Sequence, residues 1–194
     1  MARIGQMPRP PRLRSERQPK PLDAAKLEEL ALAYVARFAT TRAKLEAYLR
    51  RKLRERGWDG EAPARPEALC MRFVEAGYID DAAWARMKAG SLLRRGYGER
   101  RVSQALHAAG IEADLREDVA PGDGAARRAA MALAQRRRFG PWGSETNDRT
   151  VREKQLAAML RAGHSLDIAR EIVDATDPHA LEDWARSADG DEIC

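Results

Sequence analysis

Large apolar residues recur along the chain at intervals of three and four positions, the spacing of one face of an α-helix. Two clear runs lie in the first third of the sequence, at Leu27, Leu30, Ala31, Tyr34, Val35 and Phe38, and at Leu45, Tyr48, Leu49 and Leu53. Asp23 precedes the first run and Thr40 or Thr41 the second, and these residue types cap helix N-termini. The pattern predicts a succession of short amphipathic helices.

The pattern repeats along the chain. Gly57, Gly110 and Gly163 are separated by 53 residues in each case, and a large apolar residue stands four positions before each of them. A glycine at such a place typically ends a helix in the left-handed conformation. Each copy therefore predicts three helices, the second of which ends at the glycine. The predicted division is a basic arm at 1–22, helical units at 23–80, 81–120 and 125–176, and an acidic tail at 177–194.

Composition supports an all-helical fold. Val, Ile and Thr together account for 17 of the 194 residues, whereas Ala, Leu, Arg and Glu are abundant. Helices favour the second group and strands the first. Three short helices bury little apolar area alone, so the units should stack on one another. We predict an all-α, elongated and curved array of three tandem three-helix units, which presents a long binding face rather than one deep pocket.

Charge is sorted along the sequence. The net charge is +5, but residues 1–22 carry +5 and residues 177–194 carry −5, from six charges against one in each case. Both tails are expected to be solvated and disordered. The second helix of the first unit, residues 42–56, carries +5, whereas the third helix of the second unit, residues 111–119, carries −3.

This sorting separates two ways of binding DNA. A helix-turn-helix would place the third helix in a groove, but acidic third helices would be repelled by phosphates. The basic second helices and their flanks instead predict an electrostatic stripe. Its candidate partner- or DNA-binding residues are Arg50, Arg51, Arg54, Arg94, Arg95, Arg100, Arg101, Arg136, Arg137 and Arg138.

The sequence offers little for catalysis. His107, His164 and His179 have no partner at metal-ligand spacing, so surface or capping roles are expected for them. The segment Gly96-Tyr97-Gly98 begins like a dinucleotide loop but has Arg101 at its third glycine position and no strand before it. We predict that the protein is not an enzyme and that it binds no cofactor and no metal ion. Two distant cysteines and the absence of a long apolar run indicate a reducing cytoplasm and no membrane span.

Several segments resemble the RecX regulatory proteins in order and spacing. They are Gly77-Tyr78-Ile79-Asp80-Asp81-x-x-Trp84-Ala85, Arg94-Arg95-Gly96-Tyr97-Gly98-Glu99-Arg100-Arg101-Val102, Ala105-Leu106-x-x-x-Gly110-Ile111 and Arg161-Ala162-Gly163-His164-Ser165. The resemblance extends over about residues 27–175. Thr41, Lys44 and Ala105 stand where members of that family commonly have Ser, Glu and Glu.

The resemblance implies a cytoplasmic bacterial protein that binds the RecA recombinase, lies along the groove of its filament on DNA, and restrains strand exchange and ATP hydrolysis. DNA phosphates would be contacted through the filament, and a monomer is expected because tandem units already supply a repeated surface. The alternative is a helical-repeat protein that coats DNA non-specifically without any recombinase. Tyr97 and Trp58 are the aromatic residues near basic stretches that could stack on single strands.

Overall fold

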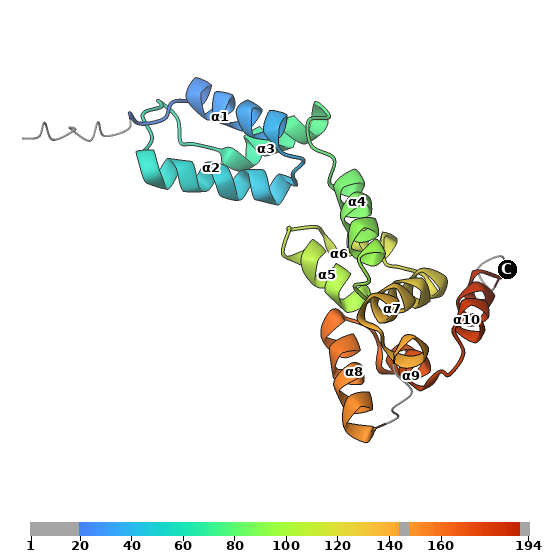
Figure 1. Ribbon diagram of the computed structural model, residues 1–194. Helices are drawn as coiled ribbons and strands as arrows, with labels where there is room; N and C mark the ends of the chain where they lie inside the picture. Colours follow the sequence, from blue (N-terminus) through green and yellow to red (C-terminus); the bar gives the residue numbers. More distant parts are fainter. Residues whose placement is uncertain (1–19, 144–147, 191–194) are drawn as a thin grey trace, which may run out of the picture.

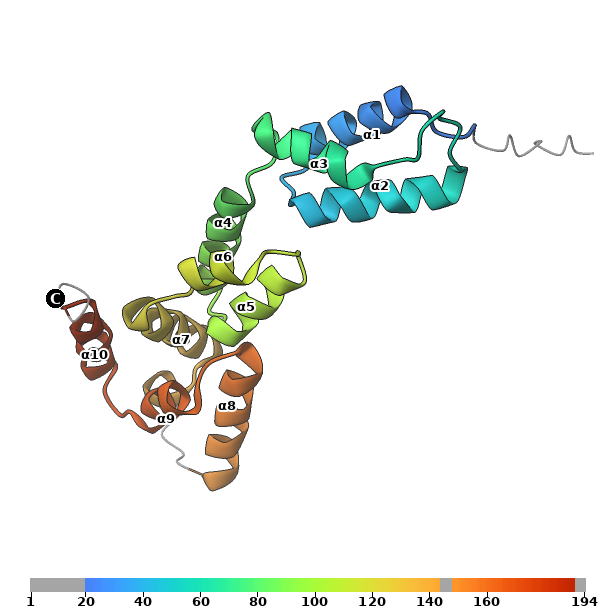
Figure 2. The same cartoon turned by 180° about the vertical axis from the view of Figure 1, so that it is seen from behind.

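The computed structural model describes residues 20–143 and 148–190, and in that part of the chain it is built from helices (Figure 1). The predicted all-α class is confirmed. The elements are α1 (Ala24–Arg37), α2 (Arg42–Arg56), α3 (Pro66–Glu75), α4 (Asp81–Arg94), α5 (Glu99–His107), α6 (Ala113–Asp118), α7 (Asp123–Arg137), the 3-10 turn η1 (Gly140–Trp142), α8 (Arg149–Ala162), α9 (Leu166–Asp174) and α10 (Pro178–Gly190). They follow one another along an elongated, bent molecule, seen from behind in Figure 2.

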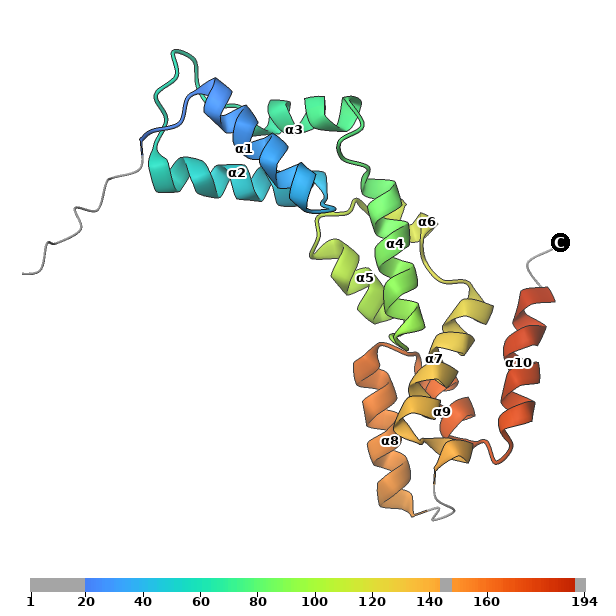
Figure 3. The same ribbon diagram turned by 45° about the horizontal axis from the view of Figure 1, so that its top comes forward.

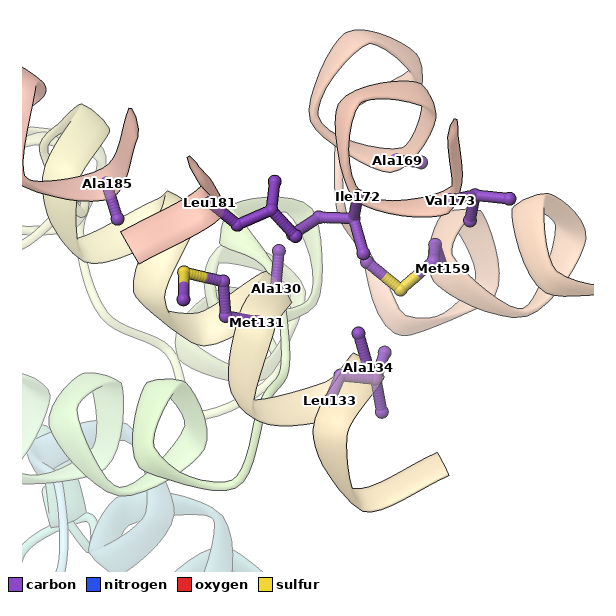
Figure 4. Packing of buried hydrophobic residues seen from close by; sticks show 10 residues of the cluster. All are labelled: Ala130, Met131, Leu133, Ala134, Met159, Ala169, Ile172, Val173, Leu181 and Ala185. Carbon is purple, nitrogen blue, oxygen red and sulfur yellow. The ribbon is translucent and has the colours of Figure 1, made fainter. Parts of the chain in front are cut away.

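Three separate clusters of buried side chains hold these helices together. The first joins α1, α2 and α3, and the second joins α4, α5 and α6. The third joins α7, α8, α9 and α10, where Met159 and Ile172 are fully buried against Ala130 and Ala134 (Figure 4). We refer to these groups of helices as the first, second and third units. Each core is small, so contacts between the units matter for stability.

Side-chain caps define where several helices begin. The Asp23 carboxylate accepts a hydrogen bond from the backbone of Lys26 at 2.7 Å, as expected for the first helix. Of Thr40 and Thr41, it is Thr41 that caps α2, by accepting from the backbone of Lys44 at 3.2 Å. Because the cap uses the backbone of Lys44, the missing glutamate at that position leaves it intact.

The glycines with the 53-residue period occupy equivalent places. Gly57 and Gly163 are the residues that end α2 and α8, and Gly110 lies in the turn after α5. Their φ angles are +81°, +98° and +74°, in the left-handed region that favours glycine. The repeat found in the sequence is therefore a repeat of positive φ, although ψ is 176° at Gly57 and 12° at Gly163.

Successive units are joined head to tail through these second helices. At the first joint, between α2 and α5, the Thr41 hydroxyl donates to the carbonyl of Ala109 at 2.6 Å. At the second joint, between α5 and α8, the backbone of Gly98 donates to the carbonyl of Ala162 at 2.9 Å. In both cases the N-cap residue of one second helix contacts the carbonyl of the residue that precedes the periodic glycine of the next unit.

These joints bring backbones very close together. A Cβ added to Gly110 would lie 2.2 Å from the Cβ of Ala43, and one added to Gly163 would lie 2.6 Å from the backbone nitrogen of Arg101. Both distances are far below van der Waals contact. A Cβ added to Gly57, by contrast, would meet nothing within 4 Å. The two internal glycines are therefore required by the joints as well as by their φ angles.

The free end of the first unit is covered by the chain itself. The backbone of Leu22 donates to the carbonyl of Gly57 at 3.0 Å, much as Arg100 donates to Gly163 at 3.2 Å in the second joint. Leu22 is fully buried in the first core. The prediction that the disordered arm extends to residue 22 is wrong for Leu22, which packs because it is apolar and pairs with the backbone beside Trp58. The rest of the predicted arm, residues 1–19, lies outside the described residues.

The acidic C-terminal segment also differs from its prediction. Residues 178–190 form α10, which packs along α7 (Figure 3). Leu181, Ala185 and Ala188 are buried, and their spacing of four and three places them on one helix face. The expected solvated, disordered tail is therefore wrong for this segment, because an apolar stripe outweighs its negative charge. Residues 191–194 of the predicted tail lie outside the described residues.

Candidate functional site

The three second helices lie on one side of the molecule. Figures 1 and 3 both show α2, α5 and α8 along the inner side of the bend, with α6 and α10 on the other side. This arrangement follows from the two head-to-tail joints, which connect the ends of these helices. The second helices thus share one side of the molecule, and the ten candidate arginines, five of which lie at the ends of α4 and α7, all have exposed side chains.

Three of the candidate arginines belong to α2. Arg50 ion-pairs with Glu46 at 2.8 Å and also with Glu67 of α3. Its hydrogen bond to Glu67 raises the pKa of the guanidinium above its ordinary value. Arg51 lies 3.6 Å from Glu55. Arg54 makes no ion pair within the described residues. Positive charge on this helix is therefore partly neutralised, and Arg54 has the least compensated guanidinium of the three.

Three more candidates meet where α4 and α7 end. Arg94 closes α4, Arg95 follows it, and the guanidinium of Arg136 donates to the carbonyl of Arg95 at 2.5 Å. Arg95 also lies 5.5 Å from the centre of the Tyr97 ring. Because α4 packs on α7, two arginine-rich segments that are about 40 residues apart in sequence become neighbours.

The next two candidates flank the second joint. The guanidinium of Arg100 donates to the carbonyl of Leu160 on α8, and Arg101 reaches Gln104 at 3.5 Å. Arg137 and Arg138 extend from the end of α7, where Arg138 has a left-handed φ of 56°. In the described part of the chain none of these four arginines pairs with a carboxylate. The structure thus places Arg50, Arg51 and Arg54 in one group and the other seven candidates around the second and third units.

Some carboxylates of the acidic third helices pair with second helices instead of forming a separate surface. Arg152 of α8 binds both carboxylate oxygens of Asp174 of α9, at 2.5 and 2.6 Å. This contact lowers the pKa of Asp174 and raises that of Arg152. Arg42 similarly reaches Glu112 at 3.1 Å across the first joint. The basic stripe is therefore interrupted where such pairs form.

His164 lies inside the second joint, although a surface or capping role was expected for it. Its side chain is 3% exposed, and its Nε2 lies 3.1 Å from the carbonyl of Gly96. Burial lowers the pKa of His164, against the opposing effect of the Gly96 carbonyl. The residue is buried because α8 ends against the Gly96-Tyr97-Gly98 turn. That turn, considered above as a dinucleotide loop, is a helix-to-helix connection within the second joint.

Sequence reasoning missed one aromatic cluster. Phe38 was assigned to the apolar stripe of the first helix, but it follows α1 and is 52% exposed. Tyr34 and Tyr48 lie beside it, and Arg37 and Arg51 flank the rings. The sequence did contain a signal, because Tyr34 stands four positions before Phe38 and Tyr48 stands three before Arg51, so each pair shares a helix face. The two pairs form one cluster only when α1 and α2 are placed side by side.

The described residues offer neither a metal site nor a membrane-spanning helix. They contain no group of three or more His, Cys, Asp or Glu side chains that could hold a metal ion. Within the same residues, no helix is long and apolar enough to cross a membrane. Open hollows do occur, such as one of about 850 Å³ between α1, α3 and the loop after Trp58, so the array is not uniformly flat.

Known proteins resemble the chain over most of its length. A regulatory protein RecX of Myxococcus xanthus is 33% identical over 176 residues, which cover 84% of this chain and 91% of that protein. The regulatory protein RecX of Deinococcus radiodurans is 32% identical over 182 residues, covering 91% and 79% respectively. A crystal structure of RecX from Lactobacillus salivarius has the same fold, with a TM-score of 0.63 at 21% identity over 79% of this chain and 96% of that one. No family model matches the chain.

Proposed function

The chain belongs to the RecX family of regulatory proteins, and from that membership we propose that it binds the filament of the RecA recombinase on DNA. Binding restrains strand exchange and the ATP hydrolysis coupled to it. The protein acts as a monomer in the bacterial cytoplasm, without a cofactor, and lies along the filament groove. Contacts with DNA phosphates are made through that groove.

The arrangement of the second helices carries this proposal. A bent array with α2, α5 and α8 on its inner side offers a long concave surface, which suits a long helical partner better than a small ligand (Figure 1). Arginines on such a surface attract the phosphates of nucleic acid and acidic protein side chains. A surface of this kind holds a partner by many weak contacts spread over three units.

The arginines without carboxylate partners contribute most to binding. Arg94, Arg101 and Arg137 come from three different helices or their ends and make no ion pair within the described residues. Arg50 and Arg51 contribute less, since each is already near a glutamate. An arginine that gives up a carboxylate to bind a phosphate recovers only the difference between the two interactions.

The first experiment measures the DNA-dependent ATPase of RecA with sub-stoichiometric amounts of this protein, with and without excess bare DNA. Inhibition that survives excess DNA supports a filament ligand. Inhibition that excess DNA abolishes supports the alternative, a protein that coats DNA non-specifically. No inhibition under either condition contradicts both and leaves an inert helical array.

A charge-reversal variant then tests the surface. R94E/R101E/R137E should weaken filament binding and reduce the slope of log affinity against log salt by up to about 3, since each phosphate contact contributes about 0.9. The matched control is R65E/R72E/R186E, which changes the net charge equally at α3 and α10. Equal losses in the two variants, or an unchanged salt slope in the first, would contradict the assignment of this surface.

A further inference from the structure

The aromatic cluster of the first unit extends from the core of that unit into solvent. The rings of Tyr34 and Tyr48 are stacked, with centroids 4.5 Å apart and an interplanar angle of 27°. The Phe38 ring lies 5.3 Å from Tyr34 at an angle of 53°. The two tyrosines pack partly against the first core, whereas Phe38 lies past the end of α1 and is 52% exposed. Phe38 thereby extends the two packed rings into one continuous aromatic patch that reaches solvent, and contiguous apolar patches of this kind serve as binding surfaces.

Cationic side chains surround these rings. The guanidinium of Arg37 is 5.6 Å from the centre of Phe38, and that of Arg51 is 5.6 Å from the centre of Tyr48. Lys52 adds a third positive charge 5.9 Å from Tyr48. The one carboxylate that pairs with Arg51 and Lys52 in the described residues is Glu55, so the local charge stays positive. Aromatic rings under cations attract a ligand that is both flat and negatively charged.

The rings and cations enclose a shallow hollow. It has a volume of about 390 Å³ and is lined by Ala33, Tyr34, Arg37, Phe38, Tyr48 and Arg51. Its walls come from α1 and α2, which pack against each other, so the hollow is preformed. Its exposed wall, Phe38, lies in the short segment between these two helices, where a ring can approach from solvent.

We propose that this hollow stacks an unpaired base of single-stranded nucleic acid, while Arg37 and Arg51 hold the phosphates beside it. Ring-on-base stacking works for any base because every base has a π face, and arginine adds cation–π contact and charge. Duplex DNA hides its base faces and cannot use the hollow. The site goes beyond the proposed function, which requires contacts with a filament and with phosphates but no contact with a base.

The test uses the full chain, without recombinase, and a fluorescent thymidine strand of about 15 nucleotides followed by anisotropy. Phe38→Leu keeps the side chain apolar but removes its π face, and we expect it to weaken binding about tenfold. Tyr78→Leu is the matched control, because Tyr78 is 58% exposed in the same unit and no cation of the described residues lies over its ring. This control should bind as the unchanged protein does. Circular dichroism checks that both variants fold.

Two further ligands separate stacking from other effects. On an abasic strand with the same number of phosphates, and on a duplex, Phe38→Leu should bind as tightly as the unchanged protein. Equal weakening on the abasic strand, or unchanged binding to the thymidine strand, would overturn the proposal. So would a variant that keeps its affinity for single strands but loses recombinase inhibition, because the hollow would then take a protein segment. Failure of the inhibition assay in the unchanged protein contradicts the proposed function instead.

Discussion

Replacement of Gly110 by alanine tests the head-to-tail joint directly. The φ of +74° costs an alanine about 1–2 kcal/mol, since its Cβ approaches the following carbonyl. The new methyl group would also lie 2.2 Å from the Cβ of Ala43, where about 3.5–4 Å is needed. Such overpacking typically adds about 1–3 kcal/mol. Gly110→Ala should therefore lower the free energy of unfolding by about 2–5 kcal/mol.

Gly77 supplies a matched control because it has the same φ as Gly110 and the same pattern of backbone hydrogen bonds in its turn, without the joint. Its φ is +74° and a Cβ there would meet nothing within 4 Å, so Gly77→Ala should cost only the conformational term of about 1–2 kcal/mol. Urea unfolding followed by circular dichroism gives both values. The difference between the two variants measures how tightly the first and second units are packed.

A second substitution identifies the source of that difference. Ala43→Gly removes the methyl group that the new Cβ would strike, and the nearest remaining atom, the Cα of residue 43, is 3.7 Å away. The double variant Ala43→Gly/Gly110→Ala should therefore lack most of the destabilisation that overpacking causes in Gly110→Ala alone. If Gly77→Ala and Gly110→Ala prove equally destabilising, or if Ala43→Gly gives no recovery, the close contact at the joint does not exist in solution.

Further predictions concern burial and titration. Leu181→Ala should lower the free energy of unfolding by about 2–5 kcal/mol, because this α10 side chain is 2% exposed, whereas a truly solvated tail would show no change in urea unfolding. The lowered pKa of His164 means that the unfolded state binds more protons, so stability should fall as pH drops below 6.5; His164→Leu should remove that part of the pH dependence. Burial raises the pKa of Cys70 to about 12, so in a Cys194→Ser variant a thiol reagent at neutral pH should react only on unfolding.

Much of the fold follows from local patterns in the sequence. The 53-residue glycine period, the caps at Asp23 and Thr41 and the 3.6-residue stripes are local signals, and the structure contains each of them. The segment at 178–190 also carried its stripe at Leu181, Ala185 and Ala188, but net charge was given more weight than periodicity. A helix can bury one face however acidic the opposite face is.

The site could be predicted less well because its geometry depends on contacts between units. Thr41 was recognised as a cap, but nothing in its sequence context shows that its hydroxyl also donates to a carbonyl 68 residues away. Backbone contacts at Gly98 and Gly163 leave no side-chain pattern beyond the glycines themselves. The basic character of the second helices could be counted, whereas the pairing of Arg50 with Glu67 requires α2 and α3 to be placed side by side.

The first joint also makes the molecule a lever. The helices beyond it, α5 with 9 residues and α8 with 14, together reach up to about 35 Å at 1.5 Å per residue. A change of about 10° at Thr41 and Gly110 would therefore move the far end of α8 by up to about 6 Å, more than one helical turn. Small adjustments at the first joint can thus follow large changes in the pitch of a long partner.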